Sequence, residues 1–124
     1  MSAPGAVELI VGCRRDPRFG PLVLVGLGGV YAEVLRDVAV ALAPAGPEEL
    51  EELIRSLRGA ALLAGARGRP PVDVTAVACA ASALSRLAAD RPELAEIEIN
   101  PLLALPEGAV GLDARVVLAP ALAG

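Results

Sequence analysis

The stretch E-I-E-I-N-P-L at residues 96–102, followed by D-A-R at 113–115, decides how this chain folds. Polar and apolar residues alternate through it, and a period of two predicts a strand with one buried face. A tight connection with Glu107–Gly108 at its tip would return a second strand beside the first. The sequence therefore predicts a closing hairpin over residues 94–105 and 109–118.

The register of this hairpin determines which side chains meet. On the predicted strand Glu98, Asn100 and Leu102 share a face, because side chains alternate. With the predicted tip, Leu102 lies opposite Asp113. Asn100 then lies opposite Arg115, and Asn100 and Asp113 become diagonal neighbours roughly 7–8 Å apart. A slip of one residue would move Asp113 to the other face of the sheet.

Oxygen-bearing side chains in this arrangement suit a magnesium ion. Glu98, Asn100 and Asp113 would offer two carboxylates and an amide oxygen. Mg²⁺ takes one or two carboxylates and leaves its other positions to water and phosphate oxygens. Arg115 could balance the charge of such a site, contact a phosphate, or pair with Glu98. The alternative is that both carboxylates are solvated charges on an exposed face, and geometry alone leaves both interpretations open.

The rest of the chain changes from strands to helices and back. Alternating or apolar runs separated by turn residues predict strands at 7–13, 22–25, 30–35 and 37–43. Pro47 begins a helix with a buried stripe of leucine and isoleucine. Asp73 caps a second helix from about Val74 to Ala89, with Val77, Ala81, Leu84 and Leu87 on its buried side. This order indicates an α+β fold, an antiparallel sheet with helices packed on one face.

Composition narrows the class of function. The 124 residues suffice for one domain. No apolar run reaches the ~18–20 residues of a membrane helix, and the first residues do not read as a signal peptide, so we expect neither feature. The net charge is −4 and the only aromatic residues are Phe19 and Tyr31, so neither nucleic acid nor a membrane is an expected partner.

Cys13 and Cys79 match no metal spacing and are expected to be buried. A cytoplasmic protein is expected.

Lysine and histidine are both absent, and all eleven positive charges are arginines. The chain therefore offers no phosphorylatable histidine, no Ser-His-Asp triad and no Schiff-base lysine. Phosphate would have to be bound by arginine, backbone N–H groups and a metal ion. We expect no catalytic residue in this chain by itself.

Four stretches together resemble a known family. They are V-E-L-I-V-G-C-R-R-D-P-R-F-G-P-L-V-L-V-G-L-G-G at 7–29, L-L-A-G-A-R-G-R-P-P-V-D at 62–73, E-I-E-I-N-P-L at 96–102, and L-D-A-R at 112–115. In this order they are similar to the second lobe of the ATP-grasp region of ADP-forming acyl-CoA synthetases. The same region occurs in succinyl-CoA synthetase β-subunits and in the synthetase-like portions of bacterial protein acetyltransferases. The resemblance covers residues 6–118, which leaves 1–5 and 119–124 as expected flexible ends.

The resemblance implies a site for magnesium and ATP or ADP. Such enzymes interconvert acyl-CoA and free acid through an acyl phosphate and a phosphohistidine, and the ATP-grasp region exchanges phosphate with that histidine. The family's magnesium-binding asparagine and aspartate map onto Asn100 and Asp113. Glu98 matches the glutamate of the same motif and is implied as a direct or water-mediated ligand.

Contacts to the nucleotide phosphates are predicted outside this motif. Gly28 and Gly29 match a glycine pair of the family, whose turn with positive φ would let backbone amides approach a phosphate. An ordinary tight turn between strands is the alternative. Arg67 lies in the motif-bearing Gly-Ala-Arg-Gly loop at residues 65–68 and is preferred to Arg18 as a phosphate ligand, although either could be solvated surface.

The resemblance also implies partners. The first ATP-grasp lobe, with its phosphate-binding lysine, and the CoA-binding and histidine-bearing domains would lie outside this chain. We therefore expect the Mg-nucleotide-binding lobe of an ADP-forming acyl-CoA synthetase, inactive by itself. The alternatives are the ligand-sensing lobe of a protein acetyltransferase and a non-catalytic module that binds a partner chain.

Overall fold

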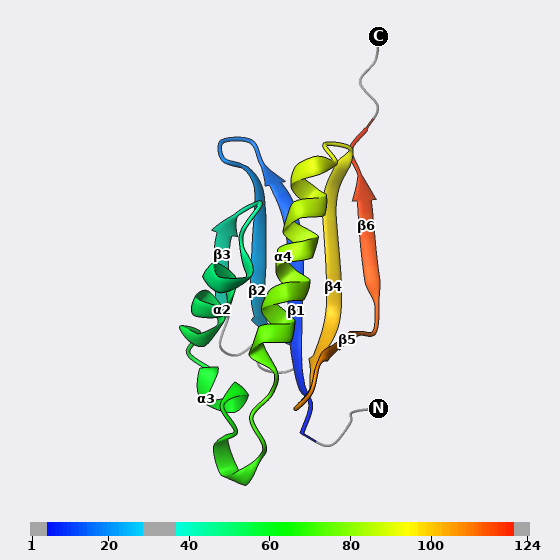
Figure 1. The fold of residues 1–124 in the computed structure, drawn as a ribbon. Helices are drawn as coiled ribbons and strands as arrows, with labels where there is room; N and C mark the ends of the chain where they lie inside the picture. Colours follow the sequence, from blue (N-terminus) through cyan, green and yellow to red (C-terminus); the bar gives the residue numbers. More distant parts are fainter. Residues whose placement is uncertain (1–4, 29–36, 121–124) are drawn as a thin grey trace.

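One antiparallel sheet with helices on one face makes up the fold of residues 5–28 and 37–120, the ranges that the computed structural model describes (Figure 1). The strands are β1 (Val7–Asp16), β2 (Gly20–Leu27), β3 (Val38–Leu42), β4 (Leu94–Ala104), β5 (Ala109–Gly111) and β6 (Ala114–Leu118). Their order is β3-β2-β1-β4, and both β5 and β6 pair with the far side of β4.

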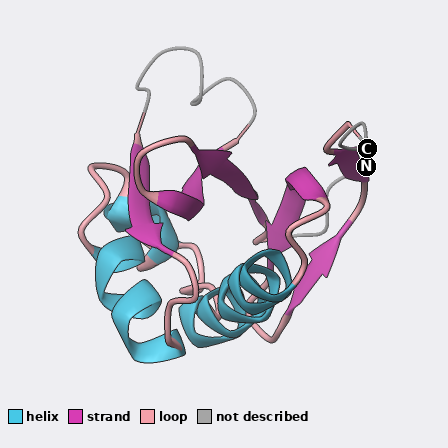
Figure 2. Cartoon of the chain, turned by 90° about the horizontal axis from the view of Figure 1, so that it is seen from above, coloured by secondary structure: helices cyan, strands magenta, loops and turns pink. Residues whose placement is uncertain are grey.

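The helices come between β3 and β4 in the chain, and they lie together on one side of the curved sheet (Figure 2). They are α2 (Pro47–Arg55), α3 (Ala60–Leu63) and α4 (Val74–Asp90), with a 3-10 turn η1 (Ala66–Gly68) between α3 and α4. This arrangement confirms the predicted α+β fold. None of the helices in the described ranges is both long and apolar enough to cross a membrane.

The core lies between the sheet and the helices. Alternate residues of β1 face it, and Leu9 and Val11 are fully buried there. From the other side α4 contributes Val77 and two alanines, Ala78 and Ala81, all with no exposed surface. Burial of these aliphatic side chains supplies the main stabilising term, at roughly 25 cal/mol per Å² of apolar surface removed from water.

Both long helices begin where the sequence predicts. Pro47 occupies the first turn of α2, and Leu50 and Ile54 are buried. The prediction that Leu87 is buried on α4 is wrong, because Leu87 is 40% exposed and lines an open hollow with Leu94 and Val116 of the sheet. Cys13 is buried as predicted, and burial raises the pKa of its thiol to about 11. Cys79 is exposed, contrary to the prediction.

The first hairpin is longer than predicted. β2 continues through Gly26, which pairs with Ile10 on one side and Val38 on the other. A Cβ atom at Gly26 would lie 2.9 Å from the carbonyl oxygen of Asp37, so glycine allows the neighbouring chain to approach. The strand predicted at 22–25 is therefore too short, because β2 runs from Gly20 to Leu27, and the predicted strand at 30–35 lies outside the described residues.

Arg15 joins α4 to the beginning of β4. Its Nε donates to the carbonyl oxygen of Leu94 at 3.1 Å, and its Nη2 donates to the carbonyls of Ala88 and Arg91, the latter at 2.9 Å. The carbonyls at the end of a helix have no partner within the helix, and a cation there also complements the helix dipole. Arg15 is thus a clamp on the C-terminal end of α4.

We expect Arg15→Ala to lower the free energy of unfolding by about 2 kcal/mol, because carbonyls bonded to a charged donor lose their partner. Urea unfolding followed by circular dichroism measures this. The control is Arg14→Ala, an exposed arginine on the other face of the same strand, for which a change within about 0.5 kcal/mol is expected. Equal effects of the two substitutions would contradict the clamp.

Asp73 joins α4 to the closing hairpin. Its Oδ1 accepts from the N–H of Ala76 at 3.0 Å as the helix cap, and its Oδ2 accepts from the N–H of Gly108 at 2.9 Å. Its own N–H donates to the carbonyl of Leu105 at 2.7 Å. The hydrogen bonds from Gly108 and Ala76 lower the pKa of the Asp73 carboxyl below its usual 3.8.

A lowered carboxyl pKa gives stability that is present above the usual pKa and is lost as the pH falls through and below 3.8. We therefore expect wild-type protein to be more stable than Asp73→Asn at pH 7, and this difference to shrink as the pH falls from about 5 to about 3. Urea unfolding at several pH values measures it. Glu107→Gln, an exposed carboxylate on the same connection, is the control. A difference that does not change with pH would exclude this role of the carboxylate.

Candidate metal centre

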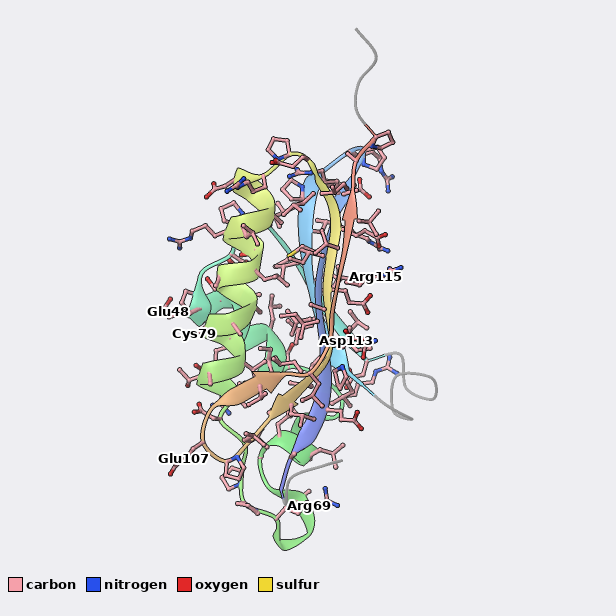
Figure 3. The ribbon with its side chains drawn as sticks, turned by 90° about the vertical axis from the view of Figure 1, so that its right-hand side faces the viewer. Glu48, Arg69, Cys79, Glu107, Asp113 and Arg115 are labelled. Carbon is pink, nitrogen blue, oxygen red and sulfur yellow. The ribbon has the colours of Figure 1, made fainter. Side chains whose placement is uncertain are left out.

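The face of the sheet away from the helices carries the candidate site. Asp113 and Arg115 lie on this open face in Figure 3, whereas Cys79 on α4 and Glu48 on α2 lie on the helix side. Glu98 and Asn100 on β4 complete the polar part of the open face. The site is therefore separated from the core by the thickness of one sheet.

An irregularity in β4 places these residues on the open face. In the pairing with β1, Leu102 lies opposite Leu9 and Ile99 lies opposite Val11. Two residues of β4, Asn100 and Pro101, therefore face one residue of β1, which is a β-bulge. The extra residue turns Leu102 into the core, where it is 3% exposed. The prediction that Leu102 shares a face with Glu98 and Asn100 is wrong for this reason.

The register between β4 and the returning strand also differs from the prediction. Glu98 lies opposite Arg115, and the N–H of Asn100 donates to the carbonyl oxygen of Asp113 at 3.0 Å. The predicted register is two residues off, because the connection is residues 105–108, closed by a hydrogen bond from the N–H of Leu105 to the carbonyl of Gly108 at 3.0 Å. A shift of two residues preserves the face. Asn100 and Asp113 are direct neighbours instead of diagonal ones.

The metal-centre pocket is a shallow hollow lined by Glu98, Asn100, Asp113, Ala114 and Arg115. The side-chain amide of Asn100 donates from Nδ2 to Oε1 of Glu98 at 3.3 Å. The N–H of Ala114 donates to Oδ1 of Asp113 at 3.0 Å. The first bond links Asn100 to Glu98, and the second fixes the Asp113 carboxylate against its own backbone.

The donor atoms of this pocket fit a hard divalent cation. Oδ1 of Asn100 and Oδ2 of Asp113 have no hydrogen-bond partner among the described residues, so an ion could use them. With Glu98 they make two carboxylates and one amide, which suits Mg²⁺ with water and phosphate at the remaining positions. Within residues 5–28 and 37–120, no three His, Cys, Asp or Glu side chains gather closely enough to hold a metal ion by themselves, so the amide of Asn100 is needed as a ligand.

Arg115 stands beside two glutamates. Its Nη2 is 3.8 Å from Oε2 of Glu98 and 4.0 Å from Oε2 of Glu96. Glu96 was not among the predicted site residues, although the alternation E-I-E-I already places it on the face of Glu98.

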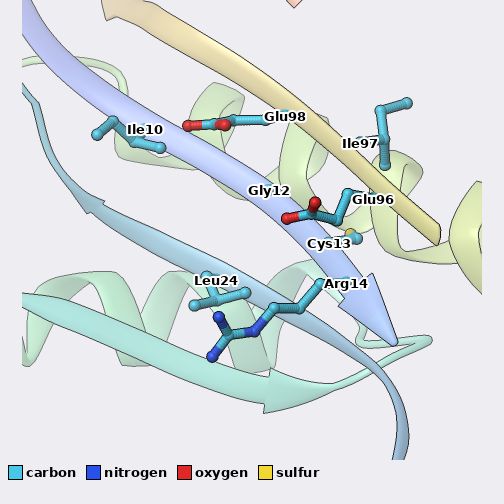
Figure 4. A pocket seen from close by; sticks show the side chains of 8 residues that line it. All are labelled: Ile10, Gly12, Cys13, Arg14, Leu24, Glu96, Ile97 and Glu98. Atoms are coloured by element: carbon cyan, nitrogen blue, oxygen red, sulfur yellow. The ribbon is translucent and has the colours of Figure 1, made fainter. Parts of the chain in front are cut away.

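A second hollow shares Glu98 with the pocket and adjoins it on the β1 side of β4. It is lined by Ile10, Gly12, Cys13, Arg14, Leu24, Glu96, Ile97 and Glu98, and Figure 4 shows Glu96 and Glu98 extending from β4 toward β1. Gly12 pairs with Glu98, and a Cβ atom there would lie 3.3 Å from the carbonyl oxygen of Ile97. The absence of a side chain at position 12 keeps the space beside Glu98 open. Sequence reasoning missed this hollow, because a glycine within a strand gives no sign of its neighbours.

Of the other predicted site residues, Gly28 is described in full, and it does not line the metal-centre pocket. The N–H of Gly28 donates to the carbonyl of Glu8 at 2.8 Å, and Gly28 lacks the positive φ that was predicted. Gly29 lies outside the described residues. The backbone of Arg67 belongs to η1, in the segment between α3 and α4. The structure thus brings together Glu98, Asn100 and Asp113, and Gly28 is not part of this group; the side chain of Arg67 lies outside what the structure describes.

A family model described as an ATP-grasp domain matches residues 1–118. The chain belongs to the ATP-grasp family. It is 45% identical over 111 residues to the β subunit of acetate–CoA ligase [ADP-forming] I of Pyrococcus furiosus, a match that covers 90% of this chain and 48% of that protein. It is 42% identical over 114 residues to acetate–CoA ligase [ADP-forming] I of Archaeoglobus fulgidus, covering 92% of this chain and 17% of that protein.

A solved structure shows the same ATP-grasp architecture. It is the dinucleotide forming acetyl-coenzyme A synthetase 1 of Ca. Korarchaeum cryptofilum, in complex with coenzyme A and Mg-AMPPCP. The TM-score is 0.89 at 42% identity, and the match covers 96% of this chain and 55% of that one. The chain spans about half the length of the Pyrococcus subunit and of this solved chain. The comparisons confirm the resemblance to ADP-forming acyl-CoA synthetases.

Proposed function

We propose that this ATP-grasp lobe binds Mg-nucleotide in an ADP-forming acyl-CoA synthetase of the acetyl-CoA type. Glu98, Asn100 and Asp113 hold the Mg²⁺ of ATP or ADP, and a phosphoryl group passes between the nucleotide and a histidine on another domain. One observation carries the proposal. Three oxygen-bearing side chains meet on the open face of a lobe that resembles, at a TM-score of 0.89, a synthetase solved with Mg-AMPPCP.

The chemistry of the pocket supports this assignment. A bound Mg²⁺ would neutralise phosphate charge and stabilise the charge that develops during phosphoryl transfer. The chain's own part is to position the ion through Asn100, which is oriented by Glu98, and through Asp113, which is oriented by the N–H of Ala114. The chain contains no histidine, so a histidine that accepts the phosphoryl group would belong to another part of the enzyme.

The open face also supports the proposed partners. Its β3 edge carries Val38, Val40 and Leu42, whose side chains are 51%, 49% and 60% exposed. A contiguous exposed apolar surface of this kind is typical of a contact with another domain. We propose that the first ATP-grasp lobe covers this edge, and that the CoA-binding and histidine-bearing domains approach the polar side near Asp113.

Two predicted phosphate contacts need separate support. The N–H of Gly28 already donates to the carbonyl of Glu8 and is not available to a phosphate. A role for this glycine pair in nucleotide binding would therefore rest on the N–H of Gly29, or on the lack of side chains at both positions, which would let the ligand come close to the backbone. Arg67 stays a proposed phosphate ligand because of its place in the Gly-Ala-Arg-Gly loop at residues 65–68. The named relatives are all acid–CoA ligases, which favours the synthetase over the acetyltransferase and the non-catalytic module.

We expect Asp113→Asn to weaken binding of Mn²⁺, a spectroscopic substitute for Mg²⁺, by at least about tenfold, because a carboxylate is replaced by a neutral amide. In the complete ligase the same change should nearly abolish phosphoryl transfer. Electron paramagnetic resonance measures free Mn²⁺, and urea unfolding should change by less than about 0.5 kcal/mol because Asp113 is exposed.

The matched control is Asp90→Asn, an exposed carboxylate at the end of α4 on the helix side of the sheet. It should leave Mn²⁺ binding unchanged. Unaltered Mn²⁺ affinity in Asp113→Asn would remove magnesium from the proposed function.

We also expect the 124-residue chain to lack ligase activity and to bind Mg-ADP more weakly than the micromolar range, because the phosphates and the base would be contacted from one side only. Isothermal titration calorimetry with Mg-ADP measures the dissociation constant. A micromolar value would show that this lobe is sufficient for nucleotide binding and would contradict the need for the first lobe.

A further inference from the structure

Arg115 lies at the border between the metal-centre pocket and the glutamates of β4. Register places it directly opposite Glu98. Its distances of 3.8 Å to Glu98 and 4.0 Å to Glu96 exceed a hydrogen-bond length, and its side chain is 65% exposed. The guanidinium is therefore held by charge, while its five N–H donors stay available to another acceptor.

A bound cation would change the partners of this arginine. Arg115 and the proposed Mg²⁺ compete for the carboxylate of Glu98. The guanidinium and the metal ion are both positive, so they repel each other across the pocket. When Glu98 turns to the metal, Glu96 still attracts Arg115 from the neighbouring position on β4. The guanidinium then remains within reach of the anion that the metal carries. A planar fork of donors matches the oxygens of a phosphate group.

We infer that Arg115 is a positioning residue that exchanges partners. It pairs with Glu98 in the free protein and contacts a phosphate of the nucleotide when the metal takes Glu98. Glu96 keeps the side chain at the pocket in both states. This inference rests on the proposed function and deepens it, because it names the side chain that contacts the phosphates from this lobe.

Partner exchange has a consequence that a purely structural role lacks. Removing Arg115 takes away a competitor of the metal and also a ligand of the phosphate. Affinity for the metal alone should therefore rise, while affinity for the nucleotide in the presence of metal should fall. A residue that only supports the fold would lower both affinities or change neither.

The test compares wild-type protein with Arg115→Ala, Arg115→Lys and the control Arg55→Ala. We expect Arg115→Ala to bind Mn²⁺ alone about two- to fivefold more tightly at low salt, less so at high salt. It should bind ADP in the presence of saturating Mn²⁺ about tenfold more weakly, because a charged hydrogen bond is lost. Arg115→Lys should restore the wild-type affinity for Mn²⁺ but only part of the affinity for ADP, because an ammonium group lacks the bidentate fork.

Arg55 pairs with Glu51 at 3.1 Å on α2, so Arg55→Ala removes the same charge from the helix side and should change neither affinity. Opposite shifts in Arg115→Ala support the exchange. Shifts in the same direction, no shifts, or tighter Mn²⁺ with unchanged ADP overturn it. Asp113→Asn distinguishes failure of the partner exchange from failure of the proposed function. If Asp113→Asn weakens Mn²⁺ binding but Arg115→Ala does not shift the Mn²⁺ and ADP affinities in opposite directions, only the partner exchange fails. If Asp113→Asn does not weaken Mn²⁺ binding, the proposed function fails as well.

Discussion

The β-bulge at Asn100–Pro101 is the constraint on which the site depends. Before the bulge, β4 turns Ile97 and the partly buried Ile99 toward the core and presents glutamates to the open face; after it, Leu102 and Ala104 enter the core. Without the extra residue, strict alternation would expose Leu102 or bury the polar side chains. One strand can therefore carry the ligand-bearing residues in its first half and a continuous core in its second half.

Contacts on the helix side hold this strand in place. Arg15 ties the beginning of β4, through Leu94, to the end of α4. At the other end of the hairpin, Asp73 at the start of α4 bonds to Gly108 and Leu105. β4 is thus attached to the same helix at both ends, so the open face can hold exposed, weakly paired side chains at defined positions. Site and stability are divided between the two faces of one sheet.

The sequence predicted the elements better than their pairing. Periodicity and caps identify α2, α4 and the strands, because hydrophobic spacing and residues such as Pro47 and Asp73 act locally. The hairpin register was two residues off and the bulge was missed, since neither leaves a local sign before the chain is paired with β1. The same holds for Asp37, predicted as a strand residue, whose buried carboxylate accepts from the N–H groups of Arg58 and Gly59. Glu98, Asn100 and Asp113 could be named in advance because a family motif carries them.

The most direct test is to locate a paramagnetic ion on the folded chain. In ¹⁵N-correlated NMR spectra with substoichiometric Mn²⁺, the account predicts that line broadening centres on the amide of Ala114, the backbone of Asp113 and the side-chain amide of Asn100. Signals of α2, on the far side of the sheet, should stay sharp. Broadening centred on the acidic first turn of α2 at Glu48 and Glu49, or broadening spread evenly over the surface, would contradict a metal centre on the open face.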